Sequence, residues 1–444
     1  MRKKKSPKHI LFYSIELNPR IQYISQLLFE QLLGLELIYT QNKEEYLSSR
    51  LAKVHYGKEW FKIGEFFIPS HSLLFEKKIK KQKFEVYKHI DLPMFFHLNK
   101  LCPYFTFDLL AMCFYLVTRY EEYLPFEADE HGRFTAENSV AYQIGFLPFA
   151  VVNLWALRLK TLLKFKFPFL KITTTTYQFQ PSFDVDMAWA FLHKGFLRTG
   201  GAIAKDILSA NFKNLIERLK VMSGKSTDPF FSFDYIHEIH QGDVPKPIFF
   251  FLLGKHGKFD KNTSPDSIPF QQLIQQISSQ YEIGIHPSYQ SNEQVDLIIK
   301  EKELLEKITK KKIVKSRQHF LKLKFPDTYR QLIAAGLKED YSMGYADALG
   351  FRASISTPFF WYDLQKEEIT DLLIHPFQLM DVTLKEYSEL DITYAKEDIE
   401  DLIADTKKSK GVFMPIWHNS SFAKLNGWDG WSEVYLHLLK KAQT

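Results

Sequence analysis

The chain has 444 residues, of which 45% are hydrophobic and 25% charged, with 58 Lys and Arg against 52 Asp and Glu. This composition excludes an intrinsically disordered or fibrous protein, and the length fits two or three domains, or one small domain and one large barrel. The net charge of +6 is small and lies partly in a basic leader at residues 2–5. Nucleic-acid binding therefore has little support.

The cysteines and the apolar runs indicate the compartment. Only Cys102 and Cys113 occur, both in apolar surroundings, which favours two buried thiols over a disulfide framework. The apolar stretch at residues 9–14 is too short for the core of a signal peptide. No run of about 18 apolar residues is present, so we expect a soluble, cytoplasmic protein with no membrane span.

The first half of the chain alternates between strand-like and helix-like segments. Residues 10–15 and 35–40 have the pattern of strands, and residues 21–33 between them have the pattern of a helix. Two apolar helices are predicted at residues 107–123 and 150–164. This alternation is typical of a small α/β domain, which we place at residues 1–175.

A loop dense in charge and aromatic rings, residues 119–134, separates the two apolar helices. Such a loop could belong to a site, but a solvated connector with internal ion pairs is the favoured interpretation. The high aromatic content of 16% has two explanations that the sequence leaves open: rings that stack on a ligand, or a compositional bias.

From residue 176 to residue 444 short apolar runs recur with helical stretches between most of them. The strand-like runs lie at residues 177–183, 247–253, 282–285, 312–316, 372–374 and 412–417, and helical stretches include residues 270–279, 292–309 and 328–335. This alternation predicts a parallel sheet, closed or nearly closed into a barrel. The interval from Met187 to Val244 is too long for one crossover, so we expect it to hold two extra helices.

Polar side chains follow several of the predicted strands. Asp184 and Asp186 end the first run, and the period-2 geometry of a strand places both on one face. Two close carboxylates repel each other, and one solution is a metal bound by one and a proton taken by the other. A turn or a helix cap would explain one aspartate better than two.

Three histidines lie at the ends of other predicted strands. His286 follows the run at 282–285, His319 follows the run at 312–316 on the same face as Arg317, and His418 follows the last run. Each histidine alone would more often be a hydrogen-bonded structural residue. Together with the two aspartates they predict a divalent metal site, with Zn²⁺ favoured by imidazole and carboxylate ligands.

These motifs resemble those of the polysaccharide deacetylases of the NodB-homology type, carbohydrate esterase family four. The resemblance is carried by Ser182 to Asp186, by Glu282 to Ser288 and by Pro415 to Asn419, and it extends from about Gln178 to the C-terminus. It implies a distorted (β/α) barrel of about seven strands after the smaller N-terminal α/β domain. The segments around Arg119, Arg317, Asp340 and Arg352 also look like a divergent bacterial branch whose N-terminal domain has unknown function.

The resemblance also implies roles for the motif residues. Asp184 would be the general base, Asp186 and His286 metal ligands, Arg317 the arginine that tethers the base, and His418 the general acid. The family has a second histidine four residues after the first, and this chain has Gln290 there. This departure puts the usual metal triad in doubt, and we assign His319 as the replacement ligand.

Other residues have looser assignments. Trp417, Tyr289 and Trp361 are candidate sugar-stacking rings, although each could equally pack in the core. Asp363 or Asp381 could orient His418. His375, at another strand end, is a reserve metal ligand for which a structural role is favoured.

The first functional hypothesis is a metal-dependent deacetylase that removes acetyl from an N-acetylated sugar or glycan precursor. The alternative is a catalytically impaired carbohydrate-binding or scaffold protein on the same barrel, which the loss of the second histidine at Gln290 would permit. A third and weaker hypothesis is a hydrolase of another acyl or amide substrate.

Overall fold

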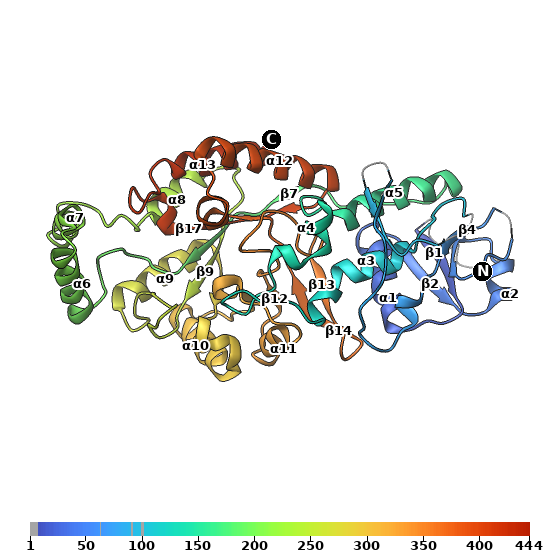
Figure 1. The fold of residues 1–444 in the computed structure, drawn as a ribbon, viewed down its shortest axis with the longest axis horizontal. Coiled ribbons are helices and arrows are strands. Elements are labelled where there is room, and N and C mark those ends of the chain that lie inside the picture. The colour runs from blue at the N-terminus through green and yellow to red at the C-terminus, as the bar shows by residue number, and fades with distance from the viewer. Residues whose placement is uncertain (1–7, 63, 90–91, 99–101) are drawn as a thin grey trace.

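The computed structural model describes residues 8–62, 64–89, 92–98 and 102–444, so the basic leader at residues 2–5 lies outside the described residues. The molecule is elongated, with a four-stranded sheet at one end, a larger sheet in the middle, and the helices α6 and α7 at the other end (Figure 1). The mixed α/β class expected from the sequence is confirmed.

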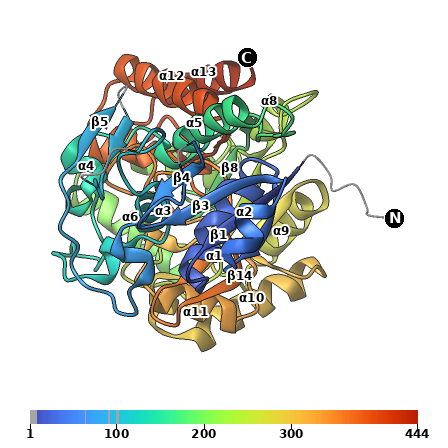
Figure 2. The ribbon, with the colours of Figure 1, turned by 90° about the vertical axis from the view of Figure 1, so that its right-hand side faces the viewer.

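The N-terminal sheet is parallel and has the strand order β2-β1-β3-β4. The end-on view in Figure 2 shows this sheet in front of the larger one. Its strands and the neighbouring short strands are β1 (His9–Ser14), β2 (Glu36–Thr40), β3 (Ala52–Gly57), β4 (Phe66–Pro69), β5 (Tyr87–His89) and β6 (Leu92–Met94). The helical segments are α1 (Pro19–Ser25), η1 (Gln26–Gln31), α2 (Lys43–Ser48), η2 (Ser72–Phe75), α3 (Leu109–Val117), η3 (Tyr120–Tyr123), η4 (Ala136–Asn138), α4 (Val140–Ile144) and α5 (Val151–Lys166).

The helix expected at residues 107–123 is shorter than predicted. It ends at Val117 because Arg119 adopts a left-handed conformation with φ of 53°, and a 3₁₀ turn follows. The predicted division of the chain at residue 175 stays a prediction, because buried side chains of both halves share one hydrophobic core.

The larger sheet has nine strands in the order β13-β14-β12-β11-β10-β9-β8-β17-β15. Its strands are β8 (Ser182–Val185), β9 (Ile248–Leu252), β10 (Glu282–His286), β11 (Lys315–Ser316), β12 (Glu339–Asp340), β13 (Phe359–Asp363), β14 (Glu368–Ile374), β15 (Leu379–Met380) and β17 (Pro415–His418), and β7 (Gln178–Phe179) pairs separately with β16 (Val412–Phe413). Its strands pair in parallel except at β13, which is antiparallel to β14. In the described part of the chain β13 and β15 do not pair, so the sheet has two edges, and closure into the expected distorted barrel of about seven strands is not shown.

Helices connect most strands of the larger sheet and cover it (Figure 1). They are α6 (Phe196–Leu208), α7 (Phe212–Met222), α8 (Phe233–Ile239), α9 (Ile268–Gln280), η5 (Tyr289–Glu293), α10 (Val295–Thr309), η6 (His319–Leu321), α11 (Asp327–Ala334), η7 (Thr383–Tyr387), α12 (Ile392–Ser409), η8 (Asn419–Phe422) and α13 (Trp431–Gln443). The long interval between β8 and β9 holds α6 and α7 in addition to α8, as the sequence predicts.

Two further sequence predictions concern the cysteines, expected to be buried thiols, and the helices, expected not to span a membrane. Both thiols are free; Cys113 is buried in α3, whereas Cys102 is only half-buried in a loop, so the expectation of two buried thiols holds for one of them. Among the described helices, none is both long enough and apolar enough to cross a membrane.

A buried ion-pair network joins the two halves of the chain. Glu122 accepts hydrogen bonds from Arg119 Nε at 2.7 Å, Arg352 Nε at 2.9 Å and Arg352 Nη2 at 2.5 Å. Arg119 also donates to Tyr345 at 2.8 Å. All three charged groups are buried, and Arg119 also pairs with the buried Glu121 at 2.9 Å, so these groups compensate one another's charges.

We expect Glu122→Gln to lower the free energy of unfolding by about 3–5 kcal/mol, because it leaves two buried guanidinium groups without their shared carboxylate. Urea unfolding measures this loss. The matched control is Glu368→Gln, which breaks an exposed pair with Lys366 and should change stability by less than about 1 kcal/mol. Equal effects of the two substitutions would contradict the role of the network.

Candidate metal centre

The candidate site lies where several strands of the larger sheet end. β8 contains Asp184 and is followed at once by Asp186, β10 ends at His286, and β17 ends at His418. His319 lies in the turn η6, just after β11. Parallel strands bring their carboxyl ends to one edge of a sheet, and this places the five side chains around one pocket.

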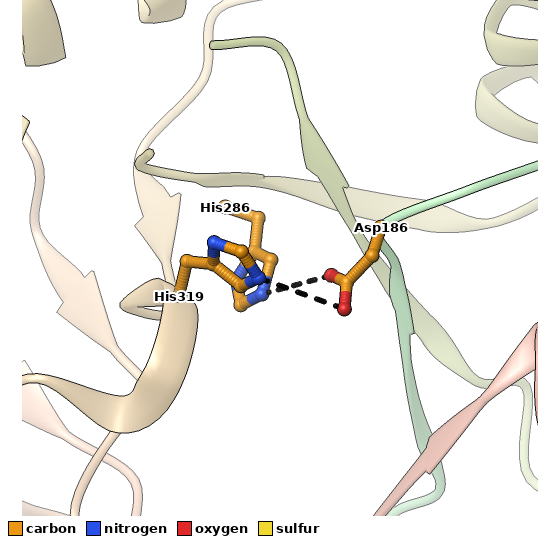
Figure 3. Close-up of side chains that lie close together, drawn as sticks. All are labelled: Asp186, His286 and His319. Atoms are coloured by element: carbon orange, nitrogen blue, oxygen red, sulfur yellow. Dashed lines mark ion pairs between the residues drawn. The ribbon is translucent and has the colours of Figure 1, made fainter. Parts of the chain in front are cut away.

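Asp186, His286 and His319 form the centre of this site (Figure 3). His286 Nε2 lies 3.3 Å from Asp186 Oδ1, and His319 Nε2 lies 3.7 Å from Asp186 Oδ2. Both rings therefore point their Nε2 atoms at the carboxylate.

Acceptors on the far side of each ring fix this orientation. Nδ1 of His286 lies 2.5 Å from the Arg317 carbonyl oxygen, and Nδ1 of His319 lies 2.8 Å from Asp260 Oδ1. Each Nδ1 therefore carries the proton, and the Nε2 lone pair is available to a metal once the ring is neutral.

The donor set fits a divalent ion. Two atoms bound to one tetrahedral ion at about 2.0–2.1 Å lie about 3.3 Å apart, which is close to the separations found here. Among the described residues, Asp186 Oδ1 is a buried oxygen without a hydrogen-bond partner, as expected of a metal ligand in a metal-free chain. Two imidazoles and one carboxylate leave a coordination position open.

Charge coupling within the site is strong. Burial by itself would raise the pKa of Asp186, but the charge of His319 and the nearby His286 hold that pKa well below its usual value. Burial by itself would lower the pKa of His319, but Asp186 and Asp260 raise that pKa to about 9. The cluster therefore favours the ionised carboxylate of Asp186 beside a protonated His319.

Asp184 lies beside this cluster and is held by Arg317. Arg317 Nη1 donates to Asp184 Oδ1 at 2.8 Å, and Nη2 donates to Ser182 Oγ at 2.9 Å. The guanidinium is fully buried and also donates to the Tyr341 carbonyl oxygen. The other oxygen of Asp184 lies 3.8 Å from His286 Nε2, so it is directed toward the metal cluster.

His418 is the third imidazole directed at Asp186. Its Nε2 lies 3.8 Å from Asp186 Oδ2, and its Nδ1 lies 2.8 Å from Asp381 Oδ1. Burial by itself would lower the pKa of His418, but Asp381 and Asp186 raise that pKa to about 10. Of the two candidate orienting residues, Asp381 is the one in contact, because Asp363 pairs with Arg330 instead.

Arg133, from the first half of the chain, also lines the pocket. It pairs with Asp129, donates to the Phe320 carbonyl oxygen at 2.9 Å, and donates to the Tyr387 hydroxyl at 3.2 Å. The loop at residues 119–134 has the internal ion pairs that the sequence favours, and residues 125–128 are exposed. It is not solvated throughout, because Arg119 and Arg133 are buried in contacts with the second half of the chain.

The pocket is small, at about 150 Å³. Cavities that enclose a whole drug-sized ligand usually measure about 300–1,000 Å³. The turn at its wall is strained, since Phe320 and Leu321, directly after His319, both have positive φ angles of 59° and 52°. The pocket therefore has room for one reacting group of a larger ligand.

For two of the three candidate rings, the prediction that they stack on a sugar is wrong. Trp417 is fully buried against Trp431 and Tyr435, because it points to the opposite face of β17 from His418. Trp361 is buried beside Tyr329. A ring enclosed in the core has no free face for a ligand.

Tyr289 remains a prediction as a stacking ring. It is half-buried, packs on Phe259 with ring centroids 4.2 Å apart, and its hydroxyl lies 3.3 Å from His131. The exposed Gln290 is not part of the cluster.

The reserve ligand His375 lies outside the site. It stacks on Tyr341, with ring centroids 4.2 Å apart, and pairs with Glu339 at 3.1 Å. All three residues line a separate cavity of about 230 Å³. His375 therefore packs and pairs as a structural residue, which is the role that the sequence favours.

Sequence reasoning missed Asp260 and Arg133. Asp260 lies in the loop after β9, so the same strand-end rule could have found it, but the seven residues between Leu252 and Asp260 carry no pattern that points to it. Arg133 comes from the loop at residues 119–134, whose dense charge allowed a site but did not indicate which residue would reach this pocket.

Comparisons with known proteins give distant similarities. A family of unknown function, DUF7033, matches residues 10–168. No curated protein sequence matches the chain.

Among solved structures the matches are also distant. A proposed polysaccharide deacetylase from Mycobacterium smegmatis is 14% identical over 60% of this chain and 84% of its own, with a TM-score of 0.39. A 4-alpha-glucanotransferase from Thermococcus litoralis is 14% identical over 61% of this chain and 37% of its own, with a TM-score of 0.36. A polysaccharide deacetylase from Bacillus cereus is 9% identical over 61% of this chain and 87% of its own, with a TM-score of 0.30. Likenesses this distant do not assign an activity.

We expect Asp260→Ala to weaken Zn²⁺ binding by about 10–100-fold, because the His319 ring loses the acceptor that orients it. Competition with a chromogenic chelator measures the affinity. Asp363→Ala removes another buried carboxylate, outside the site, and should leave the affinity unchanged. Equal losses in the two variants would show that Asp260 has no specific part in the site.

Zn²⁺ binding at pH 7 should release a proton from His319. With a pKa of about 9 in the metal-free chain, this ring is protonated at pH 7 and must become neutral to bind a metal. The apparent affinity should therefore rise with pH up to about 9. Calorimetry in buffers of different ionisation enthalpy measures the release, and an enthalpy independent of the buffer would contradict the assignment of His319 as a ligand.

Proposed function

We propose that the protein is a metal-dependent amide hydrolase that removes acetyl from an N-acetylated sugar or glycan precursor. The observation that carries the hydrolytic part is the arrangement of Asp184 on Arg317 and of His418 on Asp381, both beside the cluster of Asp186, His286 and His319. The carbohydrate part of the proposal rests on the motif resemblance described above.

Asp186, His286 and His319 would hold the metal, with Zn²⁺ favoured by this mixed nitrogen and oxygen donor set. When bound, a divalent ion lowers the pKa of a coordinated water and polarises a carbonyl. The buried arginine holds Asp184 in place beside the cluster, where its carboxylate would accept a proton as the general base.

His418 would protonate the departing amine. Its raised pKa, caused chiefly by Asp381 against the effect of burial, keeps the ring protonated at neutral pH. An amine is a poor leaving group unless it receives a proton, so a charged imidazole at this place supplies what amide cleavage requires. Its Nδ1 contact with Asp381 fixes Nε2 as the donor atom.

Asp184→Asn should lower acetate release by about 10²–10⁴-fold while metal content stays unchanged, because the substitution removes the base and keeps its shape. Release is measured on a panel of N-acetylated mono- and oligosaccharides with the Zn²⁺-loaded protein. Full activity in this variant would contradict the role of Asp184. Glycan binding by a wild-type protein that releases no acetate would instead favour the carbohydrate-binding alternative.

His418→Gln gives an independent test that leaves the Asp184–Arg317 pair intact. Because p-nitrophenolate leaves without protonation, this variant should lose about 10²-fold or more on acetamides but far less on p-nitrophenyl acetate. Equal losses on both substrates would mean that His418 does not act as the general acid.

A further inference from the structure

The helices α6 and α7 form a hairpin, residues 194–225, that the site does not use. It is inserted between β8 and α8, and it projects from the end of the molecule opposite the N-terminal sheet (Figure 1). We call it the α6–α7 hairpin.

Both helices of the hairpin leave apolar side chains in solvent. Phe196 is 92% exposed, Leu208 87% and Phe212 58%. In α7 the spacing of Phe212, Ile216 and Leu219 places them on one face of the helix. Of the 24 large hydrophobic side chains exposed in the described part of the chain, eight lie in this hairpin: Phe196, Leu197, Ile207, Leu208, Phe212, Ile216, Leu219 and Met222.

Polar side chains make the contact between the two helices. Asp206 of α6 pairs with Arg218 of α7 at 2.9 Å and accepts from Asn214 at 2.7 Å, and both charged groups are buried. Amphipathic helices of soluble domains usually bury their apolar faces and expose their polar ones. The reverse arrangement here indicates that the apolar faces bind something outside the chain.

The hairpin also holds most of the net charge of the protein. Residues 194–225 contain seven Lys or Arg and two Asp or Glu, which gives a net charge of +5 out of +6 for the whole chain. A strongly basic segment next to exposed apolar side chains is complementary to a surface that is both anionic and apolar. A second copy of the hairpin carries the same charge and would be repelled.

The base of the hairpin is fixed beside the candidate site. The buried carboxylate of Asp228 accepts from the backbone N–H groups of Ala190, Phe191 and Leu192 at 2.7–3.0 Å. Asn419, next to His418, donates to the carbonyl oxygen of Met187, next to Asp186, at 2.9 Å. These contacts fix the chain on both sides of the hairpin, and they include the sequence neighbours of Asp186 and His418.

We propose that the α6–α7 hairpin binds the surface of an anionic phospholipid bilayer. Its phenylalanine and leucine side chains enter the boundary between headgroups and acyl chains, and its lysines and arginines contact the anionic headgroups. This is binding to the surface and needs no membrane-spanning helix. Because the base of the hairpin is fixed beside Asp186 and His418, such binding brings the pocket near the membrane.

The test is co-sedimentation of the full-length protein with vesicles of phosphatidylcholine, alone or mixed with phosphatidylglycerol. We expect binding to the mixed vesicles and little to phosphatidylcholine alone. The double variant Phe196→Ser/Leu208→Ser should bind the mixed vesicles about tenfold more weakly or worse. Lys213→Glu/Lys220→Glu should have a similar effect through loss of charge attraction.

Matched controls carry the same substitutions outside the hairpin. Phe165 and Phe169 are 82% and 59% exposed, and Phe165→Ser/Phe169→Ser should bind as the wild type does. Lys164→Glu/Lys171→Glu should do the same. Vesicle binding does not depend on hydrolysis, so failure of this proposal and failure of the proposed function are distinguishable.

Three outcomes would overturn the proposal. The first is that the wild-type protein does not bind the mixed vesicles. The second is that the hairpin variants and the control variants lose vesicle binding equally. The third is a lipid-free wild-type dimer that Phe196→Ser/Leu208→Ser converts to a monomer, since this would assign the apolar faces to a second copy.

Discussion

The site depends on the orientation of three imidazole rings by acceptors on their Nδ1 atoms. A main-chain carbonyl orients His286, and buried carboxylates orient His319 and His418. Each ring then has only its Nε2 atom to direct at Asp186. Without these acceptors the rings could rotate or change tautomer, and the same residues would be a group of buried histidines with no common target.

The fold supplies this arrangement through the ends of its strands. Central strands of the larger sheet need only one to five paired residues between neighbours to bring polar side chains to the same edge. Arg317 extends inward from the end of β11 and fixes Asp184 on β8. The first half of the chain adds Arg133 and is joined to the larger sheet by the Glu122 network. The pocket is therefore assembled from both halves of the chain.

The sequence predicts the site better than it predicts the sheet. Asp184, Asp186, His286 and His418 could be found because each stands at the end of a buried apolar run, where polar residues are conspicuous. β12 and β15 could not, because two-residue strands have no periodicity. Closure of the sheet could not be predicted either, since the pairing of edge strands depends on long-range register.

The errors on single residues have physical causes as well. Trp417 alternates with His418 on β17 and therefore points into the core, which period-2 geometry already implies. The burial of Glu122 and Arg133 depends on partners in the second half of the chain that are more than 180 residues away in sequence. Local composition indicates charge in such a loop but not the surface that covers it.

The most direct test of the metal centre is the anomalous scattering of a crystal grown with Zn²⁺. We expect one strong peak about 2.0–2.2 Å from a carboxylate oxygen of Asp186 and from Nε2 of both His286 and His319. A peak bound elsewhere, for example by His375 and Glu339, or no peak among these three side chains at a Zn²⁺ concentration that saturates the protein, would contradict it.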